Sequence, residues 1–177
     1  MTELLPLFDT VIKVSTGALL TLAVIYANKN ILSNQQRRIN HNPKQHKANL
    51  LEDISECVGH VNHSFAKYSS LVIESTRFGK GWPPARKQEL DKINAQLVGE
   101  FEKLSSAEAQ LLMLGEKTME KTLRLYAARI ALFRKQVYIG REDITEQEIA
   151  ELKSGIMQLR EQFYGLLSKR YDKLLAA

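Results

Sequence analysis

The sequence predicts an all-α protein in which a single N-terminal transmembrane helix is followed by an antiparallel bundle of three or four long helices. Three observations support this fold class. Residues 14–27 form a run of fourteen residues without a charge. Beyond this run, apolar residues recur three or four positions apart over long stretches, which is the spacing of one face of an α-helix. Finally, the 177 residues contain only nine glycines and four prolines, and so low a number favours long helices over a fold with many turns.

The uncharged run predicts a transmembrane anchor, because a helix that is apolar on every side is either buried in protein or surrounded by lipid. The 24 residues from Leu4 to Ala27 would form a helix of about 36 Å, enough for the hydrocarbon core of about 30 Å. Asp9 and Lys13 lie within it. We interpret them as an i,i+4 ion pair near one interface, where Lys13 can extend its ammonium toward water. A functional intramembrane carboxylate at Asp9 is the alternative.

The charges that flank the run predict its orientation. The first twelve residues contain Glu3 and Asp9 but no lysine or arginine, which is the wrong charge for the start of a signal peptide. A cleaved signal sequence, or the central helix of a soluble bundle, remain alternatives. The following segment is basic and has no acid, so the positive-inside rule keeps it in the cytoplasm. We therefore expect a single-pass protein of the cell (inner) membrane, with its N-terminus outside and its C-terminal domain cytoplasmic.

The chain divides accordingly into an anchor (1–27), a basic juxtamembrane hinge (28–46) and a cytoplasmic helical bundle (47–177). The 25 basic and 20 acidic residues leave an excess of five, and the segment 28–49 alone carries five positive charges. This location favours attraction to anionic lipid headgroups over nucleic-acid binding. The single cysteine excludes an intramolecular disulfide and fits a reducing compartment. The predicted headgroup contacts are Lys29, Arg37, Arg38, Lys44 and Lys47.

Glycine, proline and capping residues predict where the helices of the bundle begin and end. The first runs from about Lys47 to Phe78 and ends in a turn over residues 79–84, whose glycines and prolines suit a helix end and a helix start. A second helical region spans 85–138. We favour one continuous or kinked helix there over a break at Ser105–Ser106, which would give a four-helix bundle. The last helix follows the capping box of residues 145–148, and its apolar period near 3.5 is typical of coiled coils.

Residues 56–63 contain the side-chain types of a transition-metal site, namely Glu56, Cys57, His60 and His63. At 100° per residue these side chains point in different directions, so one helix cannot bring the cysteine and both histidines to one ion. We therefore expect no metal and no cofactor. Cys57 is expected to be a core thiol and the histidines to be solvated.

No sequence motif predicts an enzyme. Residues 79–81 lack the spacing of a phosphate-binding loop, and no strand precedes them. A basic run at residues 117–141 contains a single acid, Glu120, and acids follow it at once. We interpret this arrangement as bases at one helix end and acids at the next helix start, where the helix dipoles favour each. A nucleic-acid or phospholipid patch is the alternative.

Trp82 is the strongest candidate for a protein contact, because tryptophan is enriched among binding hot spots and this one occupies an exposed-looking loop. Lys80 and Arg86 border it and could steer an acidic partner. The alternative is that the indole caps the end of the bundle.

Together these features predict a membrane-anchored scaffold, adaptor or regulatory subunit that acts through protein–protein interaction and self-association to a homo-oligomer. One alternative is an oligomeric membrane effector that forms a pore or perturbs the bilayer through Asp9 and Lys13. A second is a nucleic-acid-binding helical protein. The partner's identity does not follow from the sequence.

Overall fold

The computed structural model describes residues 43–141 and 143–176, and over these residues the chain is an all-helical bundle. The predicted all-α class is confirmed. The compact unit that contains the bundle begins at Lys47. Its helices are α2 (Pro43–Phe78), α3 (Pro84–Met113), α4 (Lys117–Gln136) and α5 (Glu146–Ala176), with a short 3₁₀ turn η1 (Gly79–Gly81) after α2.

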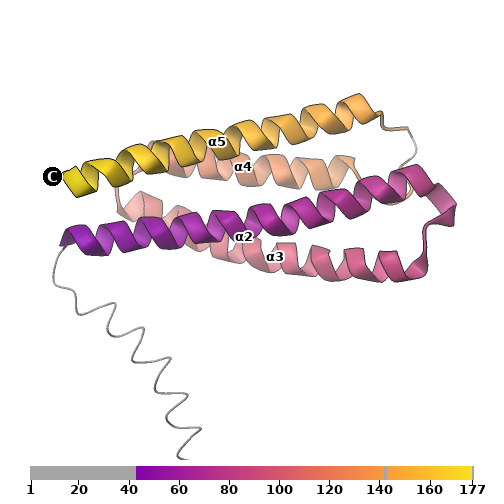
Figure 1. Cartoon of the computed structure of the whole chain (residues 1–177), viewed down its shortest axis with the longest axis horizontal. Coiled ribbons are helices and arrows are strands. Elements are labelled where there is room, and N and C mark those ends of the chain that lie inside the picture. The colour runs from indigo at the N-terminus through magenta and orange to yellow at the C-terminus, as the bar shows by residue number, and fades with distance from the viewer. Residues whose placement is uncertain (1–42, 142, 177) are drawn as a thin grey trace, which may run out of the picture. The chain divides into compact units, whose positions relative to one another are not determined.

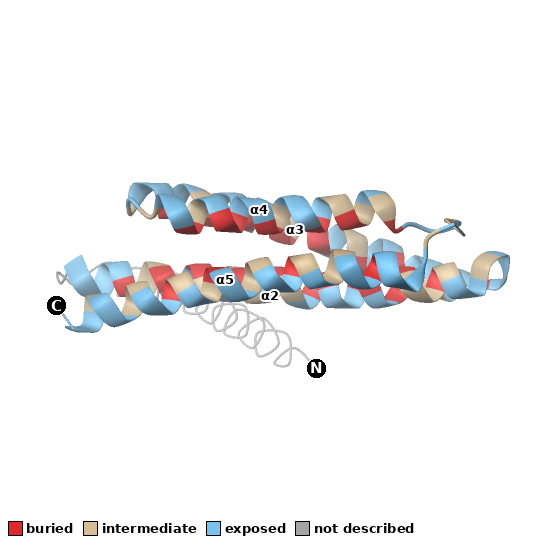
Figure 2. Ribbon diagram, turned by 90° about the horizontal axis from the view of Figure 1, so that it is seen from above, coloured by how far each residue is buried: buried red, intermediate tan, exposed pale blue. Residues whose placement is uncertain are grey.

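The four described helices run up and down, each antiparallel to the one before it (Figure 1). α2 and α5 form one layer, and α3 and α4 form the other, as the view turned by 90° shows (Figure 2). The start of α2, the α3–α4 turn and the end of α5 therefore lie at one end of the bundle. The α2–α3 turn and the α4–α5 connection lie at the other.

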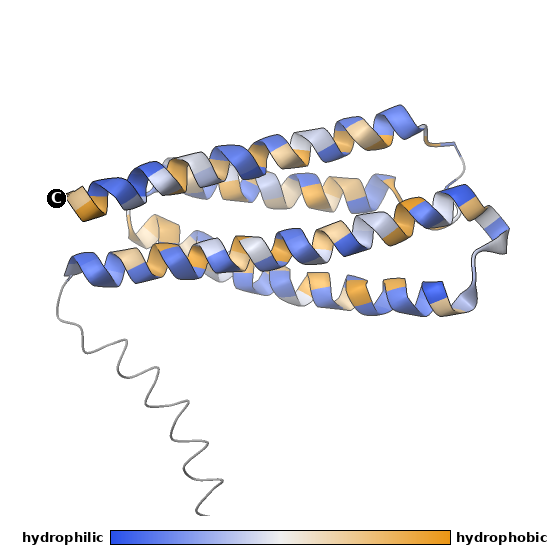
Figure 3. Ribbon diagram, viewed as in Figure 1, coloured by the Kyte–Doolittle hydropathy of each residue, from blue (hydrophilic) through white to orange (hydrophobic). Residues whose placement is uncertain are grey.

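The core lies between the two layers. Apolar residues recur along every described helix between hydrophilic ones (Figure 3), and the buried ones other than Ala48 form a single cluster. Tyr126, Phe133 and Phe163 are its largest fully buried side chains. The rings of Phe65 and Phe133 meet edge to face with centroids 5.1 Å apart, a favoured geometry for aromatic pairs.

α2 begins at Pro43, four residues before the predicted start at Lys47. Proline is tolerated in the first turn of a helix because the amide it lacks would have no partner there. The last residues of the predicted hinge are therefore helical. α2 ends as predicted: Gly79 has φ 55°, and Pro84 is the first residue of α3.

The preference for a continuous helix over residues 85–138 was wrong, and the predicted alternative break at Ser105–Ser106 was misplaced. α3 continues through both serines and ends at Met113. Gly115 then adopts φ 78°, the amide of Glu116 donates to the carbonyl of Leu111 at 2.9 Å, and the amide of Gly115 donates to that of Leu112 at 3.0 Å. This pair of bonds is the Schellman motif, which ends a helix on a left-handed glycine.

The capping box at the start of α5 is confirmed. The Glu148 amide donates to Oγ1 of Thr145 at 3.2 Å, and Oε2 of Glu148 accepts from the Thr145 amide at 2.8 Å. Polar contacts then tie α5 to its neighbours: Tyr171 Oη donates to Glu52 at 2.7 Å, and Arg170 pairs with Glu116 at 2.6 Å.

Within residues 43–141 and 143–176, no helix combines the length and the apolar character needed to cross a membrane. The predicted anchor (1–27) and most of the hinge lie outside the described residues. Lys44 and Lys47 are exposed in the first turns of α2. The other residues assigned to the anchor charge pair and to the headgroup contacts lie outside the described residues as well: Asp9, Lys13, Lys29, Arg37 and Arg38.

Candidate functional site

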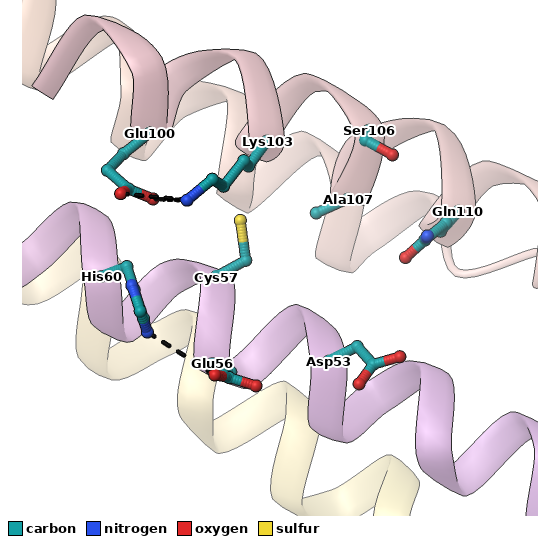
Figure 4. A pocket seen from close by; sticks show the side chains of 9 residues that line it. All are labelled: Asp53, Glu56, Cys57, His60, Glu100, Lys103, Ser106, Ala107 and Gln110. Atoms are coloured by element: carbon teal, nitrogen blue, oxygen red, sulfur yellow. Dashed lines mark hydrogen bonds and ion pairs between the residues drawn. The ribbon is translucent and has the colours of Figure 1, made fainter. Parts of the chain in front are cut away.

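A cleft of about 300 Å³ lies between α2 and α3 (Figure 4). The sulfur of Cys57 points from α2 across it toward α3. On the opposite wall Glu100 is only 7% exposed, and its Oε1 accepts a hydrogen bond from Lys103 at 3.1 Å. The complete lining is Asp53, Glu56, Cys57, His60, Glu100, Lys103, Ser106, Ala107 and Gln110.

The electrostatics of this cleft do not activate its thiol. Burial raises the pKa of Cys57 above its ordinary value of 9.0, and the negative charge of Glu100 raises it further. A nucleophilic or metal-binding cysteine needs the opposite, a pKa lowered by nearby positive charge. The positive charge of Lys103 lowers the pKa in part, but the net shift is upward, so the surroundings of Cys57 disfavour the thiolate.

The cleft brings together three of the four residues that had the side-chain types of a metal site. Glu56, Cys57 and His60 line it, and Nε2 of His60 lies 3.6 Å from Oε1 of Glu56. His63 is exposed and is not part of the lining. Over the described ranges, no group of three or more His, Cys, Asp and Glu side chains is arranged to hold a metal ion.

Trp82 is buried at 9% exposure, so the expectation of an exposed indole was wrong. Its Nε1 donates to Oε1 of Glu74 at 3.1 Å, which satisfies the one polar group of the ring while its apolar body packs on the core. The cap over the bundle end, given as the alternative, is the observed arrangement.

Arg86 is held by the same carboxylate. Its Nε donates to Oε1 of Glu74 at 3.0 Å, its Nη2 contacts Oε2, and its Nη1 bonds Glu89 at 2.6 Å. The hydrogen bonds from Arg86 to Glu74 lower the pKa of this carboxyl group most, and the bond from Trp82 lowers it second. Of the three predicted contact residues, only Lys80 remains exposed without such a partner among the described residues. No local motif pointed to Glu74, which lies eight residues before the tryptophan.

The solvent-facing side of α4 carries a line of positive charge. Spacing of three and four residues places Lys117, Lys121, Arg124 and Lys135 on one side of the helix, with Ala128 and Ala131 between them, and all six positions are exposed. Lys117, Lys121 and Lys135 make no ion pair or side-chain hydrogen bond with any residue of the described chain, and Arg124 pairs with Glu120 at 3.6 Å. We call the four cations the basic face of α4.

Helix dipoles account for only part of this charge. α4 contains six bases and one acid, but only Arg134 and Lys135 lie in its last turn, where a dipole favours cations. Lys117 lies in the first turn, where a cation is disfavoured. The sequence interpretation holds for Arg134 and Lys135 and for the acids in the first turn of α5, but it does not hold for Lys117, because it ran α3 and α4 together. Gly115 was the signal that would have placed Lys117 at a helix start.

Over the described residues, fold and surface together define a class: an up-and-down bundle of four helices with an apolar core, a cleft that contains a half-buried thiol, and a basic face on α4. No protein-family model matches the chain, and comparison with curated proteins and with solved structures found no match.

Proposed function

We propose that the chain is a membrane-tethered helical adaptor that binds protein partners rather than catalysing a reaction. Residues 4–27 anchor it in the inner membrane, and the helical bundle displays a binding surface in the cytoplasm. The surface is the basic face of α4, and its partner is an acidic protein surface, either another protein or a further copy of this chain.

The observation that supports the binding role is the basic face itself. Lys117 and Lys135 are eighteen residues apart, so the face extends about 27 Å along a regular helix. Cations of one sign on a rigid element attract an acidic surface from a distance and orient it on arrival. A purely structural role explains this charge poorly, because Lys117 opposes the dipole of its own helix.

The tether is supported by the sequence. The fourteen uncharged residues 14–27 and the five bases between Lys29 and Lys47 have the pattern of a membrane span with a cytoplasmic flank. Fractionation of cells with alkaline washing tests it. The full chain is expected to stay in the membrane pellet. Release into the supernatant, or a mature N-terminus at Asn28, contradicts the tether.

Charge reversal tests the binding surface. In the full chain, Lys121→Glu with Lys135→Glu is expected to reduce chemical cross-linking to the partner, or between copies, at least tenfold in intact membranes. The matched control is Lys67→Glu with Lys87→Glu, which reverses two exposed lysines on α2 and α3. Circular dichroism verifies that both double variants fold. An equal effect of the two pairs, or no effect of the first, contradicts the assignment.

Two other functions remain outcomes of further tests. A pore-forming effector would depolarise cells on overproduction and would lose that effect in Asp9→Leu with Lys13→Leu, whereas an adaptor leaves the membrane potential unchanged. Nucleic-acid binding is the second of these functions, because the basic face of α4 carries only positive charge and would attract phosphates. A chain with this function would retain duplex DNA with an affinity that falls steeply with salt and in the Lys121→Glu, Lys135→Glu variant.

A further inference from the structure

The end of the bundle at which α2 begins combines exposed apolar side chains with lysines. Met113 is 87% exposed, Leu175 is 69% exposed and Leu112 is 53% exposed. The ion pair of 2.6 Å between Arg170 and Glu116 holds the α3–α4 turn against the last turns of α5, so these three residues share one end (Figure 1). Lys47, Lys117 and Lys173 are exposed at the same end. We call these six residues the entry surface.

Within the described chain, the three lysines of the entry surface are all unpaired, whereas the cations of the opposite end are only partly so. At the opposite end two arginines are paired, Arg77 with Glu146 at 2.8 Å and Arg141 with Asp143 at 3.1 Å, whereas Lys80, near the exposed Phe78, has no such partner among the described residues. The three lysines of the entry surface have no ion-pair partner among the described residues. Asp172 and Glu52 are exposed acids at the same end. The entry surface therefore keeps an unneutralised positive charge next to apolar side chains.

This combination matches the boundary of an acidic bilayer. Met and Leu side chains gain free energy by leaving water for the acyl-chain region. Lysine stems can lie along the same apolar region while their ammonium groups reach anionic headgroups.

Chain connectivity favours the same occupant. Only fifteen residues, 28–42, separate the uncharged run from Pro43 at the start of α2. Fully extended, they span about 50 Å, so in a chain anchored through residues 4–27 the start of α2 lies no more than about 50 Å from the end of the uncharged run. Such a short tether corresponds to a local concentration in the millimolar range, at which even weak contacts are occupied.

We infer that the entry surface docks on the acidic leaflet of the membrane, with Leu112, Met113 and Leu175 inserted at the headgroup boundary and Lys47, Lys117 and Lys173 bound to headgroups. Lys121, Arg124 and Lys135 of the basic face of α4 are then left for the protein partner. The inference rests on the proposed tether. The bundle then stands with its opposite end, which carries Trp82, directed away from the membrane.

Site-directed fluorescence tests this orientation in the full chain. Cys57 is the only cysteine, so Cys57→Ser allows one polarity-sensitive label at Met113→Cys or, as the matched control, at the exposed Phe78→Cys. Each labelled chain is reconstituted into phosphatidylcholine vesicles with and without phosphatidylserine. The Met113 label is expected to shift its emission to the blue and to be quenched several-fold more by nitroxide lipids than the Phe78 label. Lys117→Glu with Lys173→Glu, or omission of phosphatidylserine, is expected to remove most of this difference.

Several outcomes would overturn the inference. Equal lipid quenching at both positions would do so. A Met113 label that is protected from a water-soluble quencher but is not quenched by nitroxide lipids would also do so, because it indicates contact with a second copy. Circular dichroism verifies that each labelled variant is folded.

Alkaline washing of the same vesicles separates this test from that of the tether. A chain that resists the wash while its Met113 label is not quenched by lipid overturns the docking and leaves the tether intact. A chain that the wash releases, but whose Met113 label was quenched before the wash, supports the docking and contradicts the tether.

Discussion

The indole of Trp82 and the carboxylate of Glu74 are joined by a hydrogen bond of 3.1 Å from Nε1 to Oε1. The same carboxylate also accepts from Arg86, in the first turn of α3. A single side chain of α2 therefore holds both the turn that follows α2 and the start of the next helix. The tryptophan thus belongs to the fold of this end of the bundle.

Replacing the indole should destabilise the protein. Trp82→Ala is expected to reduce the free energy of unfolding by about 3 to 5 kcal/mol, because it removes a large buried aromatic side chain and leaves a cavity. Denaturant unfolding followed by circular dichroism measures the change. The matched control is Phe78→Ala nearby, at a side chain that is 62% exposed, with an expected change within about 0.5 kcal/mol. Similar losses for the two variants would contradict the capping role.

The carboxylate of Glu74 should make stability depend on pH. Its pKa is lowered from an ordinary 4.5 by the hydrogen bonds of Arg86 first and Trp82 second. Since the unfolded chain binds this proton more readily, the stabilisation is complete above about pH 4.5 and is lost as the pH falls through the lower, folded pKa. Glu74→Gln is expected to flatten the acid side of the stability–pH curve. Glu102→Gln, at an exposed acid of α3, should retain the slope of the unmodified protein; identical curves for all three would refute the assignment.

The α3–α4 turn should depend on the backbone of Gly115. A Cβ at this position meets no atom within 4 Å, so the penalty of Gly115→Ala comes from the left-handed φ of 78° alone. We expect a loss of about 1 to 2 kcal/mol in the free energy of unfolding. Gly99, inside α3, also has open space around it, and Gly99→Ala is expected to gain about 0.5 to 1 kcal/mol. Thermal unfolding of both variants shows whether the two changes have opposite signs, as this account requires.

The hydroxyl of Tyr126 should contribute little to stability. The side chain is fully buried, its Oη has no hydrogen-bond partner among the described residues, and burial raises the pKa of the phenol. Removing a buried polar group without a partner is neutral or stabilising. Tyr126→Phe is therefore expected to leave the free energy of unfolding unchanged or to raise it slightly. A loss above about 1 kcal/mol would show that the hydroxyl has a partner, such as a buried water.

Two boundaries between the bundle helices were predictable from local turn and capping residues. Gly79 and Pro84 marked the turn between α2 and α3, and the Thr145–Glu148 capping box marked the start of α5. The turn at Gly115 was missed because the apolar residues 111–114 continue the helical pattern up to the glycine. The lesson is that one left-handed glycine outweighs an uninterrupted apolar pattern.

The surface was less predictable than the fold. The burial of Trp82 depends on Glu74 and Arg86, which lie on two different helices, and no local pattern encodes that meeting. The sequence showed that residues 117–141 are basic, but it did not show that Lys117 lies at the start of a helix. The helix-dipole interpretation of Lys117 was lost once α4 was known to begin there. Side-chain partners across helices are set by tertiary packing, which a single sequence does not display.

The position of the only tryptophan also determines what its fluorescence can report. The indole is buried and hydrogen-bonded at the end of the bundle opposite the start of α2, so its emission will shift when that end opens to water. Separation of the last turns of α5 from the α3–α4 turn takes place at the other end and will leave the emission unchanged. A comparison of tryptophan emission with circular dichroism during denaturation therefore reveals whether the two ends of the bundle melt together or in succession.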